Sequence, residues 1–210
     1  MIHSPSLTRW VSLLLLFIAL FYSLWWLADG GKLYLAGIKI LMESLAPALF
    51  SHVEKVVYSL DGGWRLSTSI HPVDNQSVTM VLGIDRVFLS KCVVWVPAAL
   101  AFIFATAFHR PKRVIAGTLL TVGISVATVL ICLAAHLAVL INATPALLDD
   151  DLLPPPADIA LAVSAYPVWY FHLVTFANYL VILVAPLVVP VLIWVAVCHR
   201  EAKELVLLRK

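Results

Sequence analysis

Charged side chains are scarce in this chain: Asp, Glu, Lys and Arg make up 12% of its 210 residues, whereas 62% are hydrophobic. Soluble domains are about 25% charged and roughly 45–50% apolar. The formal net charge of +2 is too small a surplus to indicate a nucleic-acid partner. The composition therefore excludes an ordinary soluble domain and predicts an integral membrane protein in contact with the lipid bilayer.

Chemical motifs are also missing. The three cysteines, Cys92, Cys132 and Cys198, lie in or beside apolar runs and form no CxxC pair, so no disulfide framework is expected. The chain has no P-loop, HExxH, GxSxG, EF-hand or dinucleotide-binding pattern. It also lacks a repeat typical of a transporter built from inverted halves. We therefore expect no metal and no cofactor, and favour a non-enzymatic role.

Four apolar runs can cross a bilayer, which takes about 20 helical residues. They are residues 10–28, 92–108, 114–141 and 169–198. The third is long enough to tilt or to protrude from the hydrocarbon layer, and prolines can bend the fourth. The expected fold is mainly α, with four transmembrane helices and a small external segment between the first two.

The charges between these runs predict the orientation. The turn 109–113 (HRPKR) has three basic residues and no acid, and the tail 199–210 carries more basic than acidic residues. The loop 142–168 has four Asp and no Lys or Arg. The positive-inside rule then places the N-terminal residues 1–9, the turn and the tail in the cytoplasm. The segment 29–91 and the loop 142–168 face outward.

The outward segment 29–91 reads as a small α+β unit. Residues 32–50 predict an apolar helix, lying at the membrane interface or packed on the strands. Residues 53–60 and 64–70 predict two strands joined at Asp61-Gly62-Gly63, and residues 77–84 a third strand. Because an isolated hairpin is marginally stable, three strands on the helix form the smallest plausible unit.

This unit is too small for an obvious catalytic domain and has the size of an interaction platform. The second strand places Trp64, Leu66, Thr68 and Ile70 on one face, and Arg65, Ser67 and Ser69 on the other. We name Trp64, Arg65 and Tyr58 as candidate partner-binding residues.

The outward loop 142–168 is acidic and contains three successive prolines, which favour an extended spacer. Its acids keep the loop solvated; the alternative is binding of cations or of a basic partner. Asn75 and Asn142 stand in N-glycosylation tripeptides, a signal without consequence in a bacterium.

An alternative hypothesis is a membrane enzyme. Cys92, His136 and His172 are all expected near the outer face, and a thiol beside an imidazole can act as a nucleophile. Against it, no third group orients the base, and buried cysteine commonly behaves as a small apolar residue. Thr175 and Asn178 in the fourth run are interpreted as hydrogen-bonding contacts between helices. A small transporter or channel subunit is a further alternative.

The order of parts, with the stretches GIDRVFLSKCVVWVPAALAFIFATAF and LVAPLVVPVLIWVAVCHREAKEL, resembles the small membrane proteins associated with exosortase H in Gram-negative bacteria. The resemblance covers most of the chain in layout and supplies no catalytic motif. It implies an accessory role beside an inner-membrane sorting enzyme that recognises a C-terminal signal on exported proteins. The partner would be that exosortase-like enzyme or an exported substrate.

Overall fold

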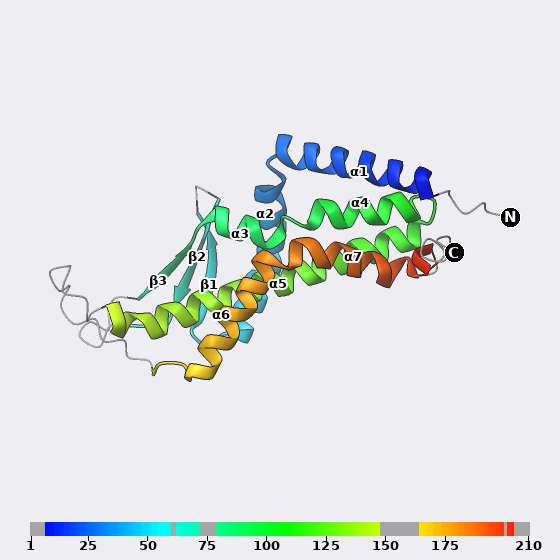
Figure 1. The fold of residues 1–210 in the computed structure, drawn as a ribbon. Coiled ribbons are helices and arrows are strands. Elements are labelled where there is room, and N and C mark those ends of the chain that lie inside the picture. The colour runs from blue at the N-terminus through cyan, green and yellow to red at the C-terminus, as the bar shows by residue number, and fades with distance from the viewer. Residues whose placement is uncertain (1–6, 60–61, 72–78, 148–163, 200, 204–210) are drawn as a thin grey trace.

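A computed structural model describes residues 7–59, 62–71, 79–147, 164–199 and 201–203 (Figure 1). Within these ranges the elements are, in chain order, α1 (Leu7–Leu27), α2 (Gly30–Leu49), β1 (Val53–Tyr58), β2 (Trp64–Thr68), β3 (Val81–Ile84), α3 (Arg86–Val93), α4 (Val96–Ala107), α5 (Pro111–Leu147), α6 (Val168–Leu183) and α7 (Ala185–Val197). The described chain is therefore mainly helical with one small sheet.

The helices α1, α4, α7 and the first part of α5 run side by side and form a bundle (Figure 1). The bundle has two ends. At one end, here called the terminal end, α1 begins, α4 joins α5 and α7 finishes; the sheet lies beyond the opposite end. Three helical stretches, 7–27, 86–107 and 111–142, are long and apolar enough to cross a membrane. This agrees with a multi-pass membrane protein.

The helix that carries the second apolar run starts earlier than the run itself. It begins at Arg86, where the Asp85 side chain accepts a hydrogen bond of 2.8 Å from the Val87 amide. It is interrupted between Val93 and Val96, because Pro97 has no amide hydrogen and its ring crowds the carbonyl four residues back.

The fourth apolar run is not one straight helix. The helices α6 and α7 meet at Val184 at an angle of 76°. Pro186 lies in the first turn of α7 and removes one donor from the helical ladder, so the bend occurs where the sequence allowed it. Counting this pair as one span gives four candidate crossings, and otherwise there are three.

The three expected strands form one antiparallel sheet in the order β1-β2-β3. Gly62 has a φ of 89°, which supplies the positive-φ position that the tight turn requires. The third strand is shorter than expected and begins at Val81, while residues 77–78 of the expected strand lie outside the described residues. The expected helix 32–50 is present as α2, which packs on β1 and runs across the direction of α1 (Figure 1).

The helix α5 holds these parts together, since it contacts α2, α3, α4, α6, α7 and β3. Its hydroxyl groups bind two of these neighbours. The Tyr34 hydroxyl of α2 donates to Ser125 over 3.0 Å, and the Thr128 hydroxyl lies 3.2 Å from the Cys92 carbonyl of α3. That carbonyl also accepts the Trp95 indole N–H at 2.9 Å, so the interruption between α3 and α4 leaves it bonded.

The side-chain amide of Asn142 joins the far part of α5 to Tyr166, just before the start of α6. The Asn142 side chain donates to the Tyr166 carbonyl and accepts from the Tyr166 amide, each over 3.0 Å. The expected loop from residue 142 therefore starts later, because α5 continues to Leu147. The proline-rich and acidic residues 149–158, and the Asn75 tripeptide, lie outside the described residues.

We predict that Gly117→Ala destabilises the bundle by about 1–3 kcal/mol, because a methyl group there overpacks the α4–α5 contact. A Cβ atom at Gly117 would stand 2.7 Å from Cδ1 and 3.0 Å from Cγ1 of the buried Ile103. The measurement is thermal or denaturant unfolding in detergent.

Gly123→Ala on the same helix is the matched control. A Cβ atom there meets nothing within 4 Å, so alanine should leave stability unchanged or raise it by up to about 1 kcal/mol. Ile103→Val should restore part of the loss in Gly117→Ala. Equal effects of the two glycine substitutions would contradict this packing.

Candidate functional site

The sheet has one buried and one exposed face. Val56, Trp64, Leu66 and Ile84 are buried and belong to the same apolar core as residues of α2 and α3. The opposite side, here called the outer face, consists of residues that pair across the strands: Lys55, Val57, Arg65, Ser67, Val81 and Gly83. The alternation predicted for the second strand is confirmed, and the described helices cover one face of the sheet.

The outer face is cationic and partly apolar. Lys55 and Arg65 are exposed, and Val57 and Val81 keep 38% and 56% of their surfaces accessible. The outer face therefore offers both positive charge and apolar surface to another protein.

The strand β3 is an edge of the sheet in the described part of the chain. The Thr68 amide donates to the Met80 carbonyl over 3.2 Å, which makes this a hydrogen-bonded pair. Because such pairs alternate along an antiparallel ladder, Leu82 and Ile84 also bond toward β2. The amides and carbonyls of Val81 and Gly83 therefore point away from the sheet, where an added strand could bind them.

The three candidate partner-binding residues differ in position. Arg65 is exposed on the outer face. Trp64 is completely buried, and its indole N–H has no hydrogen-bond partner among the described residues, so it supports the sheet from within and presents no surface to a partner. Tyr58 ends β1, and its side chain lies outside the described residues.

The candidate reactive groups are only partly brought together. Cys92 of α3 and Cys132 of α5 are fully buried neighbours, and the Cys132 sulfur lies 3.9 Å from Nδ1 of His136. His172 is exposed on α6 and packs edge-on against Phe171. Within the described residues no hydrogen bond joins Cys92 to either histidine. The structure thus adds Cys132, which sequence reasoning did not select, between two of the three candidates.

The hydrogen bonding of His136 works against its use as a base toward these thiols. Its Nδ1 lies 2.9 Å from the Cys132 carbonyl, and a carbonyl can only accept. Nδ1 therefore carries the proton in this arrangement and cannot take one from Cys132. Phe88 packs edge-on against the same ring at 4.5 Å. In this geometry the thiols and the imidazole are packing groups of the α3–α5 contact.

Two polar atoms on α6 lack the contacts that the sequence predicted. Thr175 Oγ1 and Asn178 Oδ1 are buried and have no hydrogen-bond partner among the described residues. The sequence predicted that these side chains form hydrogen bonds between helices. Among the described residues, these two atoms form none.

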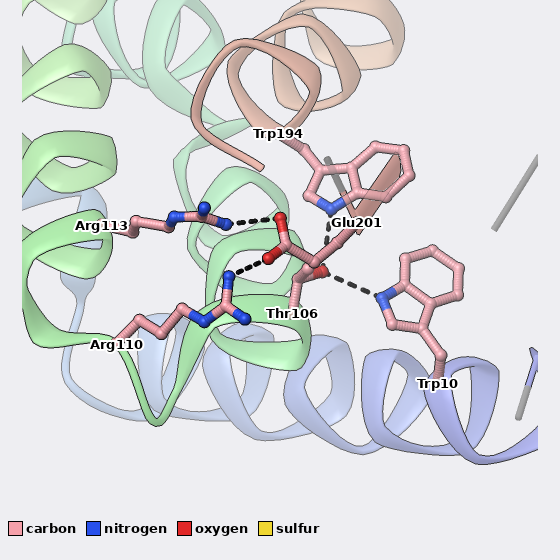
Figure 2. A network of polar contacts seen from close by, with 6 residues as sticks. All are labelled: Trp10, Thr106, Arg110, Arg113, Trp194 and Glu201. Carbon is pink, nitrogen blue, oxygen red and sulfur yellow. Dashed lines mark hydrogen bonds and ion pairs between the residues drawn. The ribbon is translucent and has the colours of Figure 1, made fainter. Parts of the chain in front are cut away.

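A polar network, missed by the sequence reasoning, joins helices at the terminal end (Figure 2). The Thr106 hydroxyl of α4 accepts the indole N–H of Trp10 at 2.9 Å and that of Trp194 at 2.8 Å. Beside it, each oxygen of the Glu201 carboxylate binds a different guanidinium, one from Arg110 and one from Arg113. Three helices meet at Thr106, and the last described turn of the chain is tied to the start of α5.

Opposing effects act on the Glu201 carboxyl. Burial alone would raise its pKa. A hydrogen bond from its own backbone amide, the hydrogen bond from Arg113 and the positive charges of Arg110 and Arg113 outweigh burial, so the pKa is lowered from its ordinary value. The carboxylate is therefore charged at neutral pH. Its ion pairs with Arg110 and Arg113, here called the Glu201 clamp, are then intact.

Comparison with protein-family models, with curated proteins and with solved structures found no match to this chain. The resemblance to exosortase H-associated proteins accordingly stays a prediction. Among the described residues, no three His, Cys, Asp or Glu side chains converge in a manner that could hold a metal ion. The outer face and the β3 edge are thus the candidate site with the most accessible chemistry.

We predict that a membrane-impermeant maleimide leaves Cys92 and Cys132 unlabelled in the folded protein and labels them after denaturation, because both thiols are buried. Mass spectrometry of the labelled peptides gives the measurement. Rapid native labelling of Cys92 would reopen the thiol-enzyme hypothesis, and loss of function in Cys92→Ser would strengthen it.

We also predict that Glu201 makes stability depend on pH. Its pKa is lower in the folded protein than the ordinary value of 4.5, so its contribution is complete above that value and disappears as pH falls through the lowered pKa. Glu201→Gln should unfold about 1 kcal/mol more easily at neutral pH. Its difference from the wild type should shrink on acidification, and a constant difference would contradict the clamp.

Proposed function

We propose that this chain is a non-enzymatic accessory protein of a bacterial inner membrane, and that it holds a partner protein at its sheet. The partner class is an exosortase-type sorting enzyme or a protein exported for it. The one observation that carries the proposal is the sheet itself, which lies beyond the bundle with an exposed outer face and a strand edge, β3, that pairs with no other strand among the described residues (Figure 1).

The orientation assumed here comes from the charges. The basic turn 109–113 and the Glu201 clamp lie at the terminal end, and the sheet lies beyond the other end. If the terminal end is cytoplasmic, as the positive-inside rule indicates, the sheet faces the compartment through which exported proteins pass. A sorting enzyme working at that surface would be within reach.

Strand addition is the mode of binding that this edge favours. An extended peptide beside β3 would pair with the outward amides and carbonyls of Val81 and Gly83. Gly83 has open space around its Cα, so a partner backbone can approach closely. Main-chain pairing provides affinity for any extended segment, and the side chains of the outer face provide selectivity.

The outer face favours a partner segment of particular composition. Lys55 and Arg65 are opposite neither to each other nor to an acid in the strand register, since Lys55 pairs with Ser67 and Arg65 with Val57 and Gly83. An acidic residue on the incoming segment would complement these cations, and an apolar residue would cover Val57 or Val81. We expect an extended segment that combines both.

We predict that Val81→Pro abolishes partner recovery while the protein stays folded. Proline removes the outward amide of β3 and leaves the ladder to β2 intact, because Val81 bonds away from β2. The measurement is co-purification, in mild detergent, with a co-expressed exosortase-type enzyme and its exported substrate.

Val81→Thr is the matched control, since it keeps the amide and a β-branched side chain. It should recover the partner as the wild type does. Leu82→Pro is a second control that breaks the β2–β3 ladder and should unfold the sheet. Full recovery of the partner by a folded Val81→Pro protein would overturn strand addition, and recovery by a folded protein lacking residues 53–84 would overturn the sheet as the platform.

A further inference from the structure

A stripe of side chains on α5 begins with a cation and continues with apolar residues. Lys112, Ile115 and Leu119 are all exposed, the last two by 59% and 66%. Positions i, i+3 and i+7 lie along one face of a helix. These three residues, here called the α5 stripe, start at the terminal end of the bundle. They continue into a stretch of α5 that is apolar enough to lie in a membrane.

Further cations surround the head of the stripe. Arg110 and Arg113 flank Lys112, and Lys203 is exposed on the last described turn. Glu201 is the one carboxylate in residues 107–116 and 201–203, and both of its oxygens are already bound. The side chain of Arg110 stays 42% exposed, so it has surface left for another anion. The head of the stripe therefore carries excess positive charge.

Two of these cations, Arg110 and Arg113, are held in place before any ligand arrives. The Glu201 clamp fixes both arginines, and the Thr106 bonds to Trp10 and Trp194 fix the helices beneath them (Figure 2). A prearranged site loses less entropy on binding than one on a mobile tail.

We propose that the α5 stripe is a binding site for one anionic phospholipid. The phosphate of the headgroup binds Lys112, with Arg110 and Arg113 adding their charge, and an acyl chain lies along Ile115 and Leu119. This ligand combines a negative group with an apolar chain in the order that the stripe presents. The site is independent of the partner-binding role of the sheet.

The test is native mass spectrometry of the purified full chain in detergent, titrated with phosphatidylglycerol or phosphatidylcholine. The wild type should bind phosphatidylglycerol more tightly. Lys112→Gln should weaken that binding about fivefold, the effect of one surface cation, and Lys112→Arg should keep it. Arg65→Gln, which removes an exposed cation at the sheet, should leave the affinity unchanged.

Equal affinity for the two lipids would overturn the proposal, and so would unchanged binding in Lys112→Gln. Equal losses in Lys112→Gln and Arg65→Gln would also overturn it, because they would show attraction to total charge and no site. A dimer that persists with lipid present and dissociates when Leu119→Asn is introduced would assign the stripe to a second copy of the chain. Since Lys112 is exposed, its substitutions should fold normally.

Discussion

The length of α5 is the constraint on which the rest of this structure depends. Its 37 residues extend about 55 Å, whereas the hydrocarbon layer is about 30 Å thick. Part of the helix must leave the membrane, and its apolar surface there needs cover. The sheet, α2, α3 and α6 supply that cover, since all of them pack on α5. A single rigid rod thus joins the membrane bundle to the strand edge that we propose as the partner site.

The two ends of the rod are built for different chemistry. At the terminal end a carboxylate binds two guanidiniums and a hydroxyl binds two indoles, so these six side chains bind one another within the chain. At the other end the sheet leaves main-chain groups and two valines accessible. Satisfied polar groups rigidify a structure, whereas unpaired strand edges invite partners. This contrast supports a rigid helix bundle that presents a strand edge able to bind a partner.

Much of the fold could be predicted from sequence because its signals are local. The alternation of Trp64, Leu66 and Thr68 with polar residues, and the glycine at the turn, predicted strands and a face that the structure confirms. The apolar runs predicted membrane helices, and the structure agrees on several of them. Prolines indicated where helices could break, but a proline does not set an angle, so the 76° bend at Val184 required packing information.

The site was less predictable, because it depends on contacts between distant residues. Glu201 lies 91 positions from Arg110, and no spacing rule relates them. Trp64 is a candidate for partner contact because it lies in the external sheet, but its place in the strand alternation puts it on the buried face. The suspected Cys92 and His136 are connected through Cys132 and Phe88, and that depends on how α3 packs on α5.

The central claim is that the two ends of α5 face opposite sides of one membrane. Labelling of single-cysteine variants with an impermeant maleimide tests it most directly, because the native cysteines are buried. Arg65→Cys should be labelled in cells whose inner membrane is intact, and Lys112→Cys only after that membrane is permeabilised. Labelling of both sites in intact cells, or of Lys112→Cys alone, would contradict the account.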